Sequence, residues 1–231
     1  MTIQQEMDAI ANNIANANTT AYKGDRVTFN QYLAQPPGGG GMASMIFPKM
    51  GSPFRETREG TINTTGNPLD VAIKGGGYFM VDTPQGRRYT RDGHFSLNTS
   101  RQIVNAAGRP ILDDGGRPIV IPPNAGTLTI DSDGSVSAGE QKLGKIRVVT
   151  FDDEQALKRA GAGLYVADNV VPKTAQKFQL VQGSLEGSNI EPIMEMTRMM
   201  ENARAYEQAQ KVMTNEDDRM RKGIEVLGKV A

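Results

Sequence analysis

Residues 196–227 read MTRMMENARAYEQAQKVMTNEDDRMRKGIEVL. Large apolar side chains recur in this stretch at every seventh position, in the series Met199, Tyr206, Met213, Met220 and Leu227. Met196, Ala203 and Ile224 fill the companion positions of the same helical face, which Gln210 and Asp217 interrupt with polar groups. A period of seven places a narrow apolar seam along a helix and is typical of a helix that packs against another helix. The pattern predicts a long C-terminal helix, from about residue 190 to about residue 229.

A second seam of the same kind lies at the other end of the chain. It is formed, at alternating spacings of four and three, by Ile3, Met7, Ile10 and Ile14. The Asn-rich residues that follow predict that this helix ends near Asn18. An apolar stripe is more often the buried side of an ordinary surface helix. Two matched seams at opposite ends instead favour a coiled coil between the terminal helices, and so short an N-terminal helix is marginal without further helical partners.

The middle of the chain has the pattern of an antiparallel β domain. Short runs of β-branched and aromatic residues, such as DVAI and YFMV, alternate with turn signals. The turn dipeptides are Gln85-Gly86, Asp92-Gly93, Asp114-Gly115 and Asp133-Gly134. The predicted fold class is therefore mainly β, with an antiparallel β-rich central domain flanked by N- and C-terminal α-helices.

These patterns divide the chain into four segments. The N-terminal helix and the residues after it occupy residues 1–34, and the C-terminal helix occupies residues 188–231. Residues 35–54 are rich in Gly and Pro and are expected to form a flexible loop without regular structure. The β-rich domain is expected to extend over residues 55–187.

Charge and composition exclude several classes of function. Lys plus Arg and Asp plus Glu number 26 each, and no stretch gathers basic with aromatic residues, which argues against nucleic-acid binding. No stretch approaches the apolar length that spans a bilayer, so no membrane insertion is expected. The first residues, MTIQQEMDAI, lack the basic and apolar regions of a signal peptide, which predicts that no cleaved secretion signal is used.

The chain contains three near matches to chemical motifs, and each is incomplete. His94 is the only histidine and the chain has no Cys, so neither a zinc site nor a histidine-assisted cysteine nucleophile can be assembled. Residues 129–140 partly match a calcium loop, but Thr129 stands where the loop needs Asp. Residues 75–77 are three glycines after a strand, without the Gly-Lys-Ser/Thr of a phosphate loop. The sequence predicts no enzyme, with no catalytic, cofactor-binding or metal-binding residue.

Three segments, in matching order, resemble the family of bacterial flagellar rod and hook proteins. DVAIKGGGYFMV and YTRDGHFSLN, within residues 70–98, are similar to the family's shared β core, and LEGSNIEPIMEMTRMMENARAYE, residues 185–207, is similar to its C-terminal signature. ANNIANANTTAYK, residues 11–23, is similar to its N-terminal signature, which here includes Ala11, Asn12, Asn13, Ala15, Asn16, Thr19, Tyr22 and Lys23. Family members usually carry further residues before this signature, so the first helix is expected to be shorter than theirs.

The resemblance implies a structural role. The terminal helices of this chain would form an inner helical layer of the basal-body rod, the drive shaft that crosses the periplasm. The β region would form an outer layer of the same rod. The implied partners are other copies of the chain, other rod proteins and the flagellar type III export apparatus. The seam residues of both helices would then form the subunit interface. GTINTTGNPLDVAI and LEGSNIEP are more similar to the proximal rod subclass; the alternatives are the distal rod subclass and a non-flagellar, glycan-binding β domain.

Overall fold

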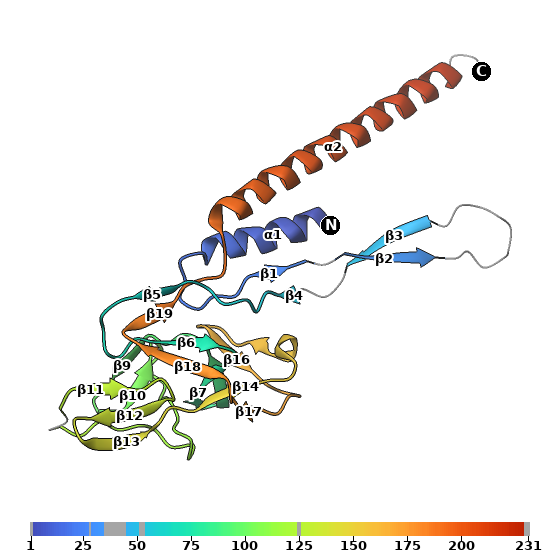
Figure 1. Cartoon of the computed structure of the whole chain (residues 1–231). Helices are drawn as coiled ribbons and strands as arrows, with labels where there is room; N and C mark the ends of the chain where they lie inside the picture. Colours follow the sequence, from blue (N-terminus) through green and yellow to red (C-terminus); the bar gives the residue numbers. More distant parts are fainter. Residues whose placement is uncertain (1, 28, 35–44, 51–53, 124–125, 229–231) are drawn as a thin grey trace. The chain divides into compact units, whose positions relative to one another are not determined.

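The computed structural model of the chain describes residues 2–27, 29–34, 45–50, 54–123 and 126–228 (Figure 1). The chain divides into two compact units. Unit 1 consists of Met1–Ala15, Asp25–Phe54 and Glu191–Ala231, and unit 2 of Asn16–Gly24 and Arg55–Ile190. Because the chain passes between the units after residues 15, 24, 54 and 190, each unit combines segments that are distant in sequence.

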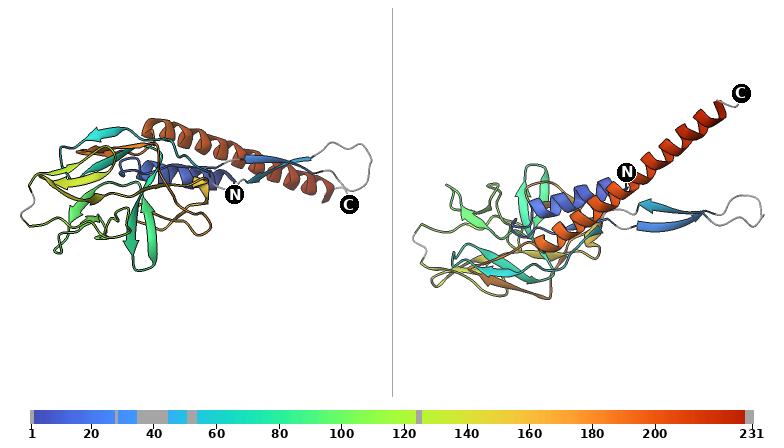
Figure 2. Two further views of the ribbon diagram at one scale, coloured as in Figure 1. Left: turned by 60° about the horizontal axis from the view of Figure 1, so that its bottom comes forward. Right: turned by 90° about the horizontal axis from the view of Figure 1, so that it is seen from above.

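Unit 1 contains two α-helices. They are α1 (Thr2–Ala15) and α2 (Pro192–Gly228), which pack side by side within the unit (Figure 2). α1 ends three residues before the predicted position because Asn16 begins a turn, in which the Thr19 N–H donates to the Asn16 carbonyl (3.0 Å). α2 agrees with the predicted helix to within two residues at each end. Neither helix, over its described length, is long and apolar enough to cross a membrane.

A strand hairpin in unit 1 corrects the loop expected at residues 35–54. β2 (Phe29–Ala34) pairs antiparallel with β3 (Met45–Met50), although β3 contains Pro48. Proline is tolerated in such a two-stranded ribbon because every second N–H of each strand faces a free edge. Two short strands flank the hairpin in sequence, β1 (Asp25–Arg26) and β4 (Phe54–Arg55). The rest of the expected loop, residues 35–44 and 51–53, lies outside the described residues.

Unit 2 is built around a six-stranded sheet in which all neighbours are antiparallel. Its strand order is β15 (Lys158–Arg159), β16 (Leu164–Val166), β8 (Gly86–Thr90), β7 (Tyr78–Thr83), β14 (Val148–Thr150) and β17 (Lys173–Thr174). The central β7–β8 hairpin turns at the predicted dipeptide, where Gly86 has a φ of 105°, in the left-handed region that favours glycine. The described residues confirm a mainly β, antiparallel fold with an α-helix toward each end.

Smaller antiparallel groups complete unit 2, and a short 3-10 helix, Glu154–Ala156, precedes β15. Those groups pair β6 (Val71–Gly75) with β18 (Phe178–Gln182), β5 (Ile62–Thr64) with β19 (Ser184–Glu186), β9 (Phe95–Leu97) with β10 (Ile103–Asn105), and β11 (Leu128–Ile130), β12 (Ser135–Ala138) and β13 (Gln141–Lys145) in a meander. The run PIVI, residues 118–121, makes isolated bridges instead of the strand that its composition suggested. Its first residue and the residue after it are prolines, which cannot donate to a ladder.

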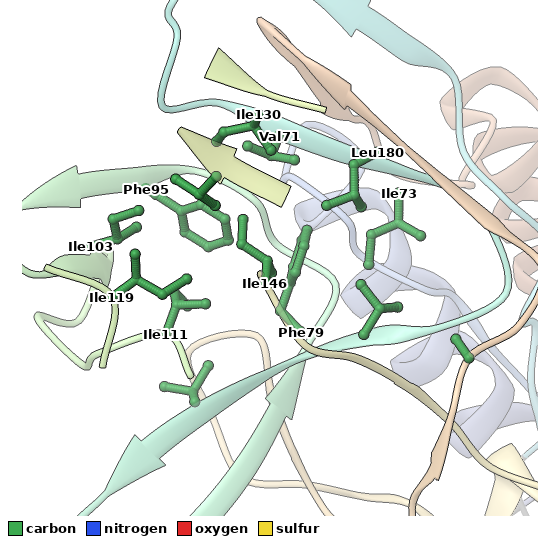
Figure 3. Packing of buried hydrophobic residues seen from close by; sticks show 14 of the residues in the cluster. Val71, Ile73, Phe79, Phe95, Ile103, Ile111, Ile119, Ile130, Ile146 and Leu180 are labelled. Carbon is green, nitrogen blue, oxygen red and sulfur yellow. The ribbon is translucent and has the colours of Figure 1, made fainter. Parts of the chain in front are cut away.

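The six-stranded sheet has an apolar cluster on each face. Side chains of β7 alternate between the clusters, with Phe79 and Val81 in one and Tyr78 and Met80 in the other. In the first cluster, shown in Figure 3, Phe79 packs edge-on against Phe95 with ring centroids 5.0 Å apart. The second cluster is largely aromatic and includes Tyr78, Tyr89, Phe151 and Tyr165. β7 is therefore buried on both faces and forms the centre of unit 2.

The packing of unit 2 makes a testable distinction between two glycines. A Cβ atom at Gly93 would lie 1.7 Å from the Val71 carbonyl oxygen, whereas one at Gly76 would meet nothing within 4 Å. Because backbone cannot yield as a flexible side chain can, we expect Gly93→Ala to lower the free energy of unfolding by about 3 kcal/mol or more. The control Gly76→Ala should change it by less than about 0.5 kcal/mol. Chemical denaturation followed by tyrosine fluorescence measures both, and equal midpoints would contradict the packing described.

Candidate functional site

One face of α2 packs against α1 near the start of α2. The side chains on it recur at helical spacing, with Glu195 buried and Arg198, Met199, Asn202 and Ala203 half-buried. This spacing of three and four residues is that of a helix with one covered face. At about 1.5 Å per residue, the 14 residues of α1 span about 21 Å and the 37 of α2 about 55 Å. α1 can therefore accompany less than half of α2.

A buried amide locks the two helices together at that end. The Asn13 side chain accepts from the Asp25 N–H (3.1 Å) and donates to the Asp25 carbonyl (2.9 Å), so it satisfies both backbone groups of that residue. It also donates to Glu195 Oε2 on α2 (3.3 Å), while Glu195 Oε1 accepts from Arg198 (2.6 Å). Since buried polar groups require such partners, the register of α1 on α2 is set by polar contacts as well as by apolar ones.

Beyond Ala203 the seam of α2 is open. Every described side chain from residue 204 to residue 222 is exposed, with Met213 at 70 % and Met220 at 60 %. Successive seam positions drift by only about 20° per heptad on a straight helix, so Tyr206 and both methionines continue the face of Met199. The helix therefore presents an apolar stripe that nothing in the described chain covers.

The remaining predicted seam residues fall on both sides of this division. Ile10 is buried, and Ile3, Met7 and Ile14 are half-buried on α1. Met196 is exposed beside the packed face of α2. Ile224 and Leu227 belong to α2, but their side chains lie outside the described residues.

The end of the N-terminal signature is anchored inside unit 2. Lys23 is only 1 % exposed, and its Nζ lies 2.7 Å from Glu186 Oε1 on β19 and donates to the Arg58 carbonyl (2.7 Å). Burial lowers the pKa of the Lys23 ammonium, and the neighbouring Glu186 carboxylate opposes that change. The backbone is joined at the same place, because the Ala21 N–H donates to the Glu186 carbonyl (2.8 Å).

A second cation completes this buried network. Arg91 Nε lies 2.5 Å from Glu186 Oε2, and its Nη2 donates to the Gly75 carbonyl (2.8 Å). Glu186 Oε1 also accepts from the Gly60 N–H (3.0 Å). Glu59, whose side chain is largely solvent-accessible, lies 3.9 Å from Arg91 and supplies a second carboxylate. The network is thus close to neutral and well supplied with hydrogen bonds, as a buried ion pair must be.

Asn189 holds the same segment from the other side. Its Oδ1 accepts from the Gly24 N–H (2.9 Å), and its Nδ2 donates to the Glu56 carbonyl (2.8 Å). The Asn189 N–H donates to the Tyr22 carbonyl (3.2 Å), and the Arg159 guanidinium lies 4.7 Å from the centre of the Tyr22 ring. The segment Asn16–Gly24 is consequently part of the fold of unit 2.

The other signature residues have simpler positions. Ala11, Asn12 and Ala15 are exposed on α1. Asn16 and Thr19 form the turn after α1, where the Thr19 hydroxyl donates to Asn16 Oδ1 (3.2 Å). Sequence reasoning missed Glu186, Arg91 and Asn189, although all three lie within the quoted family segments. Nothing in the neighbouring sequence distinguishes this carboxylate, guanidinium and amide from exposed side chains of the same types.

The near matches to chemical motifs occupy structural positions. His94 is mostly exposed, with Nδ1 2.9 Å from Asp70 Oδ1. Residues 129–140 include the β11–β12 hairpin, in which Asp133 Oδ1 accepts from the Ser135 N–H (3.0 Å). No group of three or more potential metal ligands occurs among the residues that the structure describes.

Three segments of the chain match models of known protein families. The family model described as "Flagella basal body rod protein" matches residues 1–23, that of the "Flagellar hook protein FlgE/F/G D1 domain" residues 72–138, and that of the "Flagellar basal body rod FlgEFG protein C-terminal" residues 181–226. The matches cover the signature segment, the β core and the α2 region. The chain belongs to the family of flagellar basal-body rod proteins.

Individual relatives refine this assignment. The flagellar basal-body rod protein FlgF of Caulobacter vibrioides is 39 % identical over 232 residues, covering 100 % of this chain and 95 % of the relative. FlgF of Mesorhizobium japonicum is 34 % identical, covering 99 % and 94 %, and the rod protein FlgG of Bacillus subtilis is 34 % identical, covering 93 % and 90 %. The chain is thus FlgF-like, and its role is that of a structural subunit of the rod.

The buried ion network predicts the effect of removing one charge. In Lys23→Met the Arg58 carbonyl keeps only its donor from Asn189 Nδ2 (3.1 Å), and Glu186 loses one of its two close cations. Because breaking a buried ion pair leaves an undercompensated charge, we expect the free energy of unfolding of unit 2 to fall by about 3–5 kcal/mol. The control Lys74→Met, at an exposed lysine of β6, should cost less than about 0.5 kcal/mol. Urea denaturation compares the two variants, and similar losses would contradict the account of Lys23.

Proposed function

We propose that this rod subunit polymerises through its terminal helices, and that helices of neighbouring rod subunits cover the exposed seam of α2. The observation that carries the proposal is the uncovered stretch from residue 204 to residue 222. Its seam members, Tyr206, Met213 and Met220, continue the face that packs on α1 closer to the start of α2. Burying one such side chain fully stabilises by about 1.5–3 kcal/mol, which favours association.

The period of the stripe supports a helix as the covering partner. A seam of seven-residue period matches the knobs and holes of a second helix better than the flat face of a sheet. In the assembled rod, we infer that α1 and α2 pair as a coiled coil within an inner helical layer and that the β-rich unit forms the outer layer. The seam positions Ile224 and Leu227 would extend that contact.

Membership of the family supports a set of partners and a location. The partners are other copies of the chain and other rod proteins, together with the flagellar type III export apparatus that delivers unfolded subunits. The location is the part of the basal body that crosses the periplasm, reached without a cleaved signal peptide. A subunit of this kind performs no catalysis, and its function lies in the geometry of its contacts.

Position along the rod separates two alternatives within the family. FlgF relatives support a place in the proximal rod, while the similarity to FlgG of Bacillus subtilis keeps the distal rod as the alternative. The two readings share the assembly mechanism and differ in the neighbours that each subunit contacts.

The seam assignment predicts an assembly defect without loss of the β fold. The double variant Met213→Asp/Met220→Asp places two charges in the stripe, and burying an unpaired charge costs several kcal/mol. We expect the variant to be exported but not incorporated into basal bodies, with unit 2 unfolding at the wild-type denaturant concentration. Immunoblots of purified basal bodies from a complemented deletion strain measure incorporation.

A charge-matched control separates the seam from a general effect of added charge. Asn215 and Gln208 are exposed and lie off the stripe, so Gln208→Asp/Asn215→Asp adds the same charge away from the proposed contact. This variant should be incorporated more readily than the seam variant. Incorporation of the seam variant at the wild-type level, or an intact rod in the deletion strain, would overturn the proposal.

A further inference from the structure

Basic side chains gather around one turn on the surface of unit 2. The turn is formed by residues 113–117, in which the Gly116 N–H donates to the Asp113 carbonyl (2.9 Å) and the Asp113 N–H donates to the Arg117 carbonyl (2.8 Å). The turn is fixed to its neighbours because the Asp114 N–H donates to the Lys145 carbonyl (3.0 Å). It is therefore a rigid platform.

Three guanidinium groups approach three successive residues of this turn. Arg147 Nη1 donates to the Asp114 carbonyl (3.1 Å). Arg117 Nη2 lies 3.6 Å from the position of a Cβ at Gly115, and Arg87 Nη2 lies 3.3 Å from that of a Cβ at Gly116. Successive Cα atoms are only about 3.8 Å apart, so the groups converge on a small area. The Asp113 carboxylate borders the same area, with Oδ1 3.1 Å from the position of a Cβ at Gly115.

Of the three guanidinium groups, only that of Arg117 is in an ion pair within the described part of the chain. Arg117 lies 3.6 Å from Asp113 Oδ2, and Asp113 Oδ1 already accepts from the Arg117 N–H (2.8 Å). Neither Arg87 nor Arg147 has a carboxylate within ion-pair distance in the described part of the chain, and the other acidic residue of the turn is Asp114. Arg147 Nε is buried and has no hydrogen-bond partner among the described atoms.

A buried phenol completes the surroundings. Burial raises the pKa of Tyr89, and the positive charges of Arg87 and Arg147 oppose that rise, which places both guanidinium groups within electrostatic range of the hydroxyl. Tyr89 belongs to the aromatic cluster of unit 2, so it anchors this edge of the site to the core. The three guanidinium groups therefore come from separate parts of the chain, and all three parts belong to unit 2.

We propose that the surface formed by Arg87, Arg117 and Arg147 binds the carboxylates of an acidic segment of a protein partner. Guanidinium groups present paired donors that match the two oxygens of a carboxylate. The surface is open, with Arg117 82 % exposed at its side chain. A small free anion would be weakly held on such a surface, whereas a segment with several carboxylates engages the three cations at once.

The test is a titration of the full-length protein with a blocked tetra-glutamate peptide. We expect saturable shifts of the Gly115 and Gly116 amide resonances and an affinity that falls as salt is raised. Arg87→Gln/Arg147→Gln should weaken binding by about fivefold or more. The conservative Arg87→Lys/Arg147→Lys should weaken it less, because it keeps the charges and loses only the paired donors.

The control Arg204→Gln/Arg221→Gln removes the same charge from exposed positions of α2 and should leave binding unchanged. Retained amide dispersion shows in each case that unit 2 is folded. Absence of saturable shifts, or equal affinity in the Gln variant at the turn and in the control, would overturn the proposal. Inorganic phosphate that binds as tightly as the peptide would also overturn it, since the surface would then recognise any small oxyanion.

Discussion

A buried carboxylate, Glu186, is held between the ammonium of Lys23 and the guanidinium of Arg91. Charges removed from water are tolerated only when their partners are close and their remaining donors are satisfied, and both cations also donate to backbone carbonyls. This arrangement forms only if the segment Asn16–Gly24 lies against β19, far away in sequence. The network therefore joins two segments of unit 2 that are 163 positions apart in sequence, before any contact between subunits is made.

Polar contacts also fix the two helices of unit 1 to each other, but only where α2 begins. In unit 1, Asn13 binds both Asp25 backbone groups and Glu195, so α1 and α2 are set in one register where α2 begins. Farther along α2, among the described residues, the exposed seam consists of the apolar series Tyr206, Met213 and Met220 beside the polar companions Gln210 and Asp217. α2 is therefore held in a defined direction by α1 near its start, while the seam on the rest of the helix stays exposed.

Local patterns predicted much of this fold, and contacts between distant residues were beyond them. Heptads identified α2, and the dipeptides Gln85-Gly86, Asp114-Gly115 and Asp133-Gly134 identified turns, because each pattern is written in neighbouring residues. Asp92-Gly93, also predicted to turn, instead joins β8 to β9 without a turn. The partners of Lys23 could not be predicted, since Glu186 is 163 positions away and looks like any surface carboxylate in sequence. The β2–β3 hairpin was missed because the Gly and Pro content of residues 35–54 argued against regular structure, while a two-stranded ribbon accepts a proline such as Pro48. A seam pattern by itself does not say whether the partner of Met213 and Met220 lies in the same chain, but the short first helix already pointed to partners in other subunits.

The most direct measurement is a reconstruction, at side-chain resolution, of assembled basal-body rods from a strain that produces this chain. The account predicts that Met213 and Met220 are buried against helices of neighbouring subunits, with the Lys23–Glu186–Arg91 network intact in each copy. Methionines that face solvent in the assembled rod, or that pack only on their own subunit, would contradict it.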